Sequence, residues 1–414
     1  MMRTKAAGGS PDALGQGDPL DMEATDQLSQ QLDEERNDRL QQNLGAAMKQ
    51  IAHSKLVSRL LSLDMMVKSV PSPTQSHTPS PTPSGIIGFR SIGFGQCGLI
   101  FERPGRKQVV KVARPGFHEA LLIDYEAHQA VVAAFTAQKD NPECRVPQVF
   151  RHISKNEQEW WQDNKSLFPK QHSSFPLPSS ALTSERILPL PKVIRDLFIN
   201  EFCPEHRRQD AFSSPLNRDC LARVYLGRRR LPNQPAPMNF ALRNYNLCLD
   251  QMVQLDLPVL FYAIAIGEAL AIIHWKANVD GYDIEYVLGS EAEPTSEETS
   301  RKRRATRIWV LDFNLCTRWE EKVGWKQPQA LIEQLVLAFF ENDPYYPLPF
   351  PEDEFDEQLW LAFKDEYLRK SKEILAEKDE RLHSLPKKFI KACESREREN
   401  LMKGLGHGHR DHKG

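Results

Sequence analysis

The chain has 414 residues, 40% of them hydrophobic and 27% charged, a composition typical of a folded protein with room for two domains. Its 54 Lys and Arg residues nearly balance its 56 Asp and Glu residues, which argues against a general nucleic-acid binder. Seven cysteines occur without a Cys-x-x-Cys pair or a Cys/His cluster at zinc spacing, so we expect no zinc site. With no recognisable secretory signal, we expect free thiols and a cytoplasmic or nuclear location.

The N-terminal part of the chain divides into three predicted segments. Residues 1–24 are rich in Gly, Asp and Pro and are predicted to be disordered. Residues 25–68 place an apolar stripe on one helical face, typical of an amphipathic helix that either docks a protein partner or packs on its own domain. Residues 69–85 are a Ser/Thr/Pro-rich tract and predict an extended linker.

A glycine-rich stretch, "SIGFGQCGLIFERPGRKQVVKVA", fills residues 91–113 and predicts three strands joined by tight turns. Gly93, Gly95 and Gly98 form a G-x-G-x-x-G motif, but no helix follows as in a dinucleotide-binding fold, and no Gly-Lys-Ser/Thr follows as in a P-loop. A hairpin of this kind allows the glycine backbone to fold over a polyphosphate. We expect Ile100 to face the same side and to rest on a base.

Lys111 lies in the third of these strands. Strand alternation places it on one face with Val109 and Ala113, so the ammonium lies on an otherwise apolar surface and needs an acidic partner. The next helical stretch, "FHEALLIDYEAHQAVVAAF", offers Glu119 and Glu126, and we favour Glu126. The alternative is a lysine that extends to the edge of the sheet without a buried partner.

The second half of the predicted site lies about two hundred residues further along. Residues 259–274 predict a buried helix rather than a membrane span, because Gly267 and Glu268 interrupt the apolar run. A loop carrying Asp280 and Asp283 follows, then a short strand, a polar insert at about 290–307 that is predicted to be disordered, and a strand ending at Asp312. An aspartate in such a loop can orient a hydroxyl, and one at the strand end can hold Mg²⁺.

In this order and spacing the chain resembles the protein-kinase-like superfamily, including its aminoglycoside-phosphotransferase branch, over about residues 88–350. The resemblance implies a two-lobed α+β fold with a small β-rich N-lobe and a mainly helical C-lobe, at residues 86–351. It implies ATP and Mg²⁺ as cofactors and places the hinge near "LTSERILPL". Its implied roles are nucleotide binding for Gly93, Gly95, Gly98, Ile100, Val109, Lys111 and Glu126, metal binding for Asp312 and Glu285, and catalysis for Asp280. The chain is also similar to uncharacterised fungal proteins that share "NRDCLARVYLGRRR" and are sometimes labelled zinc-finger-like.

Departures from the kinase pattern leave two functions open. Asn278 replaces the histidine of the catalytic loop (unless His274 is its counterpart), Glu285 replaces the asparagine that holds a second metal, and no Ala-Pro-Glu follows Asp312. The chain is therefore either a phosphotransferase that acts on a hydroxyl of a small molecule or protein, or a pseudokinase-type scaffold.

The remaining segments are predicted to bind proteins rather than nucleic acid or membrane. Residues 352–403 predict charged helices that, with the N-terminal helix, could engage protein partners, and residues 404–414 predict a disordered His/Gly tail. A regulatory nucleic-acid binder that uses "GRRR" at 227–230 and "RKRR" at 301–304 is the least favoured class. "RKRR" also resembles a nuclear-localisation patch.

Overall fold

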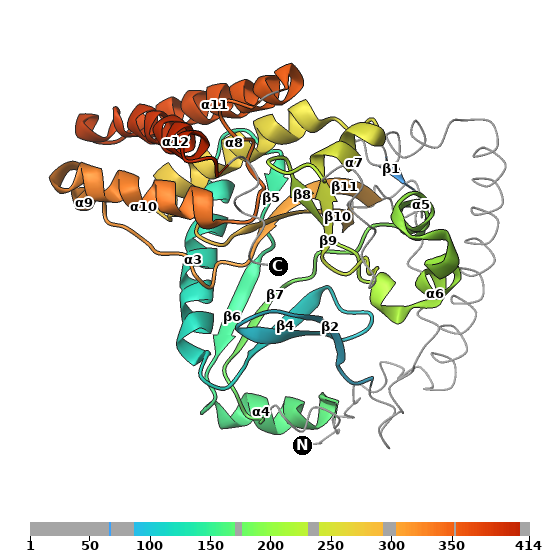
Figure 1. Ribbon diagram of the computed structural model, residues 1–414. Coiled ribbons are helices and arrows are strands. Elements are labelled where there is room, and N and C mark those ends of the chain that lie inside the picture. Colours follow the sequence, from blue (N-terminus) through green and yellow to red (C-terminus); the bar gives the residue numbers. More distant parts are fainter. Residues whose placement is uncertain are drawn as a thin grey trace, which may run out of the picture.

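The structure is a computed structural model that describes residues 66–67, 87–169, 176–230, 240–292, 304–351 and 353–405 (Figure 1). The predictions for the N-terminal tail, nearly all of the amphipathic segment, the linker, most of the His/Gly tail and the centre of the polar insert lie outside these residues. The described part has an α+β architecture with two sheets and two lobes, as the sequence predicts.

The N-lobe is built on a five-stranded antiparallel sheet with the order β2-β3-β4-β7-β6. The three predicted strands are β2 (Arg90–Phe94), β3 (Gly98–Glu102) and β4 (Gln108–Ala113); β6 (Val149–Ile153) and β7 (Ala181–Glu185) complete the sheet. The turn between β2 and β3 is closed by the amide of Gly95, which donates to the carbonyl of Gly98 at 2.9 Å. The predicted strand–turn–strand pattern of residues 91–113 is therefore confirmed.

The two faces of this sheet are covered differently. Phe101, Val110 and Val112 belong to a small buried core that also contains Trp161 of α4 (Gln158–Asn164). The long helix α3 (His118–Thr136) runs beside β6 and extends from the N-lobe toward the C-lobe helices, at the left of Figure 1. The face that carries Val109 and Lys111 is turned toward the C-lobe.

The C-lobe surrounds the buried helix α8 (Val259–Trp275), which is enclosed on nearly all sides. Gly267 lets helix α11 (Glu354–Leu375) cross closely, because a Cβ at this position would lie 2.5 Å from the carbonyl oxygen of Phe363. None of the described helices is both long and apolar enough to cross a bilayer. The remaining C-lobe helices are α5 (Lys192–Phe202), α6 (Arg208–Ser213), α7 (Leu249–Gln254), α9 (Glu321–Lys326), α10 (Pro328–Glu341) and α12 (Leu385–Met402).

The second sheet lies within the C-lobe in the order β1-β11-β10-β8-β9, with β5 pairing against β11. Its strands are β1 (Met66–Val67), β5 (Cys144–Arg145), β8 (Ala222–Tyr225), β9 (Tyr245–Cys248), β10 (Glu285–Ala292) and β11 (Arg304–Leu311). β10 and β11 pair from Glu285↔Leu311 to Ala292↔Arg304. The predicted disordered insert is therefore too long at both ends, because residues 290–292 and 304–307 belong to a regular hairpin.

The C-terminal helices are part of the C-lobe rather than an extension of it. Leu359, Trp360 and Phe363 of α11 and Phe389 of α12 are buried in the same core as the side chains of α8. The predicted domain boundary at residue 351 is therefore wrong, because the apolar faces of these charged helices fill the main core. The "GRRR" segment is also tied to the fold, since Arg229 forms an ion pair with Asp356.

A buried group of charges joins the lobes beside the segment that follows β7. Glu102 of β3 is 2% exposed and contacts Arg90 of β2 and Arg186, and the Nη2 atom of Arg90 lies 3.2 Å from Asp219 Oδ1 in the C-lobe. Because a buried charge requires compensation, these contacts fix the N-lobe sheet against the C-lobe at one end.

Candidate functional site

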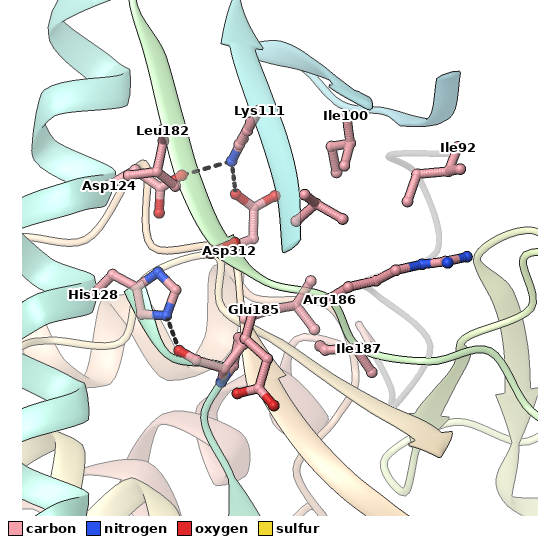
Figure 2. Close-up of a pocket in the computed structure, with 14 residues that line it drawn as sticks. Ile92, Ile100, Lys111, Asp124, His128, Leu182, Glu185, Arg186, Ile187 and Asp312 are labelled. Carbon is pink, nitrogen blue, oxygen red and sulfur yellow. Dashed lines mark hydrogen bonds and ion pairs between the residues drawn. The ribbon is translucent and has the colours of Figure 1, made fainter. Parts of the chain in front are cut away.

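A cavity of about 120 Å³ lies between the lobes, under the β2–β3 hairpin (Figure 2). It brings together segments that are far apart in the chain, from strand β2 to the end of strand β11. Its lining residues are Ile92, Ile100, Val109, Lys111, Asp124, His128, Pro147, Leu182, Ser184, Glu185, Arg186, Ile187, Leu311 and Asp312.

One part of the cavity is an apolar slot. Ile92 and Ile100 come from the glycine hairpin, whereas Ile187 lies on the opposite side, as Figure 2 shows. Val109 and Leu311 complete the walls. Ile100 lines the cavity, and its contact with a base stays a prediction. The predicted hinge segment supplies Leu182, Ser184, Glu185, Arg186 and Ile187. A slot of this kind accommodates a flat apolar group.

Lys111 lies at the inner end of the slot between two carboxylates. Its Nζ atom is 2.7 Å from Asp124 Oδ2 and 2.7 Å from Asp312 Oδ1. Burial alone would lower the pKa of Lys111, but the charges of Asp124 and Asp312 outweigh it and hold the pKa well above its ordinary value. The ammonium is therefore charged and joins α3 of the N-lobe to the segment after β11.

The acidic partner of Lys111 on the helix is Asp124 and not Glu126, so this prediction is wrong. Asp124 is 2% exposed and faces the core side of α3 with Leu121 and His128, whereas Glu126 is exposed to solvent. The error arose because Leu121, Leu122 and Ile123 are all apolar, so the sequence does not show which face of the helix is buried. The spacing of Leu121, Asp124 and His128 was the available signal.

Asp124 also holds the residue after Asp312. Its Oδ1 atom accepts a hydrogen bond from the amide of Phe313 at 3.1 Å. One turn further along α3, His128 lies with its ring 5.0 Å from the Phe313 ring, and its Nε2 atom is 2.7 Å from the carbonyl oxygen of Pro147. Burial lowers the pKa of His128. Asp312 itself has φ of 65°, a left-handed conformation that this set of contacts maintains.

The three glycines of the hairpin differ in their surroundings. A Cβ at Gly98 would lie 2.6 Å from the carbonyl oxygen of Val112, so the hairpin itself requires glycine there. A Cβ at Gly95 would have no atom within 4 Å, and one at Gly93 would make only ordinary contact with Ile100. Neither Gly93 nor Gly95 has a positive φ. The fold of the described residues therefore explains only Gly98.

Asp280, the predicted catalytic residue, is 4% exposed, and both of its carboxylate oxygens accept hydrogen bonds. Its Oδ1 atom accepts from the amides of Thr317 at 2.9 Å and Tyr282 at 3.1 Å, and its Oδ2 atom accepts from Gln334 at 2.9 Å. Both carboxylate oxygens thus hold the loop to its neighbours, and the carboxylate is buried away from solvent.

His274 also holds the loop that carries Asp280. Its Nε2 atom lies 3.2 Å from the carbonyl oxygen of Asp280, and its Nδ1 atom lies 2.9 Å from the hydroxyl of Tyr367 on α11. Burial lowers the pKa of His274 to about 3, so the ring is neutral. Because a carbonyl can only accept, Nε2 carries the proton and Tyr367 donates to Nδ1.

Asp283 lies in the same loop but in a different environment. It is half-buried, has φ of 62°, and makes no hydrogen bond or ion pair with any residue that the structure describes. Burial raises the pKa of Asp283 to about 6, and the charges of Asp312 and Asp343 contribute. The sequence prediction placed Asp283 in the loop but did not include it in the site.

Glu285, the predicted second metal ligand, is paired with Arg223 of β8. Arg223 also reaches Asp343, with Nη1 at 3.3 Å from Oδ2, and the hydroxyl of Tyr225 donates to the same oxygen at 2.8 Å. Burial raises the pKa of Glu285, and the charge of Arg223 opposes this effect.

Within the described ranges, no group of three or more His, Cys, Asp or Glu side chains is placed to hold a metal ion. All seven cysteines are free and buried.

Comparison with known proteins gives limited matches. The model of the family DUF3669, described as "Zinc finger protein", matches residues 308–379. That stretch contains one cysteine, Cys316, and no histidine, so it lacks the Cys and His ligands of a structural zinc finger. A search of curated proteins finds no match. One similar solved structure is described as "Structure of the microcompartment-associated aminopropanol kinase"; the match has 10% identity and a TM-score of 0.20, and it covers 76% of this chain and 92% of that chain. A similarity at that level adds nothing to the topology described above.

Proposed function

We propose that the chain binds ATP with Mg²⁺ and transfers the γ-phosphoryl group to a hydroxyl of a small molecule or protein. The observation that carries this proposal is the position of Lys111. It lies at the inner end of an apolar slot, beneath a glycine hairpin, and contacts Asp124 and Asp312 at 2.7 Å. A cation beside an apolar slot suits a nucleotide, which has a flat base at one end and a polyphosphate at the other.

The base would lie between Ile100 and Ile187, and the phosphates would extend toward Lys111. The close approach of a phosphate to a backbone amide requires residues without side chains. Gly93 and Gly95 fit this requirement, because no contact within the described fold requires glycine at either position.

One Mg²⁺ ion fits at Asp312. This carboxylate is 27% exposed and uses Oδ1 to bind Lys111, which leaves Oδ2 as a hard oxygen ligand of the kind that Mg²⁺ prefers. When bound, the cation would neutralise charge on the phosphates, whose oxygens would supply further ligands.

For the acceptor hydroxyl, Asp283 fits better than Asp280. The Asp283 carboxylate is partly exposed, lacks a partner among the described residues and has a pKa of about 6, which suits a group that takes a proton near neutral pH. Both oxygens of Asp280 already accept hydrogen bonds. We therefore assign the acceptor-orienting role to Asp283 and a supporting role to Asp280.

Thermal unfolding of the full chain with and without Mg-ATP tests nucleotide binding. We expect the parent to be stabilised by several degrees at saturating Mg-ATP, because a ligand that binds only the folded state raises its stability. Lys111→Ala should show no such shift. Lys155→Ala, which changes an exposed N-lobe lysine, should behave as the parent. No shift in the parent with any nucleotide or metal would remove this function.

A second function, nucleotide binding without catalysis, is favoured by one observation: Asp280 and Glu285 are both occupied within the fold. Slow hydrolysis of ATP separates the two functions, since water can replace an acceptor. A phosphotransferase should release phosphate, and Asp283→Asn should reduce the release at least about tenfold with nucleotide binding retained. Binding without any release by the parent would instead indicate the scaffold function.

A further inference from the structure

The pair formed by Arg223 and Glu285 follows from strand register. In the sheet, Arg223 of β8 is paired with Val287 of β10. Glu285 is two residues from Val287, so its side chain lies on the same face of β10 and is a diagonal neighbour of Arg223. The guanidinium therefore reaches Glu285 Oε1.

This cation is firmly held. The side chains of Arg223 and Glu285 are 20% and 19% exposed, and Arg223 makes a further contact with Asp343. Tyr225, on the same face of β8, fixes Asp343 through its hydroxyl. Removal of this guanidinium would leave Glu285 without a compensating charge, so the ion pair does not open easily.

The position of the Arg223–Glu285 pair relative to Asp312 affects metal binding. Glu285 is paired with Leu311 across the β10–β11 hairpin, so it lies beside Asp312 at the same end of the two strands. A second divalent cation at Glu285 would have to displace a guanidinium that already carries the compensating charge. At Asp312, by contrast, Oδ2 is free of partners among the described residues, and Lys111 binds only Oδ1.

We infer that the site takes one divalent cation with its nucleotide, at Asp312, and that Arg223 fills the position of a second cation by binding Glu285. This inference rests on the proposed function and narrows it. Arg223 is a positioning residue, because it acts through Glu285.

The test is the number of Mn²⁺ ions that the full chain retains with a saturating non-hydrolysable ATP analogue, measured by equilibrium dialysis. We expect about one Mn²⁺ per bound analogue in the parent. Glu285→Gln should leave that number unchanged and shift the Mn²⁺ affinity less than about twofold, whereas Asp312→Asn should weaken it at least about tenfold. Far-ultraviolet circular dichroism checks that each variant is folded.

Removal of the arginine gives the reciprocal test. Arg223→Met keeps most of the side-chain volume and releases Glu285, so a second Mn²⁺ should bind. The double variant Arg223→Met with Glu285→Gln should return to about one. A folded Arg223→Met protein that still binds one Mn²⁺ would overturn the role of Arg223. If that variant does not fold, Glu285→Gln and the parent still decide whether the site takes one cation or two.

The outcomes separate this inference from the proposed function. Two Mn²⁺ ions in the parent, or the loss of one in Glu285→Gln, would overturn the one-cation site and leave nucleotide binding intact. A parent that retains no analogue under any metal condition would overturn both.

Discussion

Two clusters in this molecule share one design, a single cation between two carboxylates. Lys111 lies between Asp124 and Asp312, and Arg223 lies between Glu285 and Asp343. The Lys111 cluster joins the two lobes, whereas the Arg223 cluster lies wholly within the C-lobe. The first therefore depends on how the lobes are arranged, and the second depends only on the local strand register.

The two clusters also differ in the burial of their carboxylates and in their position relative to the cavity. Asp124 is almost fully buried, so Lys111 is needed to compensate its charge, yet Asp312 is 27% exposed and keeps one oxygen free. In the Arg223 cluster the arginine and the glutamate shield each other, whereas Asp343 is 44% exposed and binds both Arg223 and Tyr225 through Oδ2. The two clusters therefore differ in place rather than in free oxygens, because Lys111, Asp124 and Asp312 line the cavity and none of the Arg223 cluster does.

The largest expected effect comes from Asp124→Asn. The change removes the charge that compensates Lys111 and weakens the support of Phe313, so the free energy of unfolding should fall by about 3 kcal/mol. Glu126→Gln on the same helix should change it by less than about 0.5 kcal/mol, because Glu126 is exposed. Urea unfolding of both variants measures the difference. Equal effects would show that Asp124 is not the buried partner.

Arg223→Met should come next, with a loss of about 2 kcal/mol in the free energy of unfolding. Glu285 would then be left partly buried without its cation. The matched control is Arg229→Met, which removes a more exposed partner of Asp356 and should cost less than about 1 kcal/mol. If Arg223→Met costs no more than this control, the second cluster is not a buried pair in solution.

Charges of both clusters act on Asp283, and its ionisation should be visible as a pH dependence of stability. Its pKa is raised to about 6 in the folded chain, from the ordinary value of 3.8, so the folded state binds the proton more tightly. The parent should therefore lose stability as the pH rises from about 4 to about 6. Asp283→Asn should be more stable than the parent by about 2 kcal/mol at pH 7 and equal to it near pH 4. An advantage that is the same at both pH values would contradict the shift.

The smallest expected effect concerns the hairpin over Lys111. Gly98→Ala should lower the free energy of unfolding by about 1–2 kcal/mol, because the new methyl group meets the Val112 carbonyl and approaches the Lys111 side chain at 3.4 Å. Gly95→Ala should be nearly neutral in stability, since the methyl group would enter open space. Under the proposed function, Gly95→Ala should nevertheless weaken the Mg-ATP thermal shift. Loss of stability in both variants would mean that the fold requires both glycines.

Several elements could be predicted from sequence because their signals are local. Alternation in residues 108–113 separated the Lys111 face from the face of Val110, and turn residues delimited the β2–β3 and β3–β4 hairpins. The apolar run at 259–274 indicated a buried helix, which the structure extends to Trp275. Protein partners of the terminal segments and a cytoplasmic or nuclear location stay predictions.

Other features were decided only by the tertiary structure, because they depend on which surfaces meet. The sequence by itself determined that Lys111 needed a carboxylate partner, but the choice of Asp124 over Glu126 depended on which face of α3 is turned toward Phe313. The burial of Asp280 and the pairing of Glu285 with Arg223 depend on residues 37 to 62 positions away. The local periodicity of the sequence does not predict such contacts. They become favourable only when segments far apart in the chain pack together and bury these polar groups away from water.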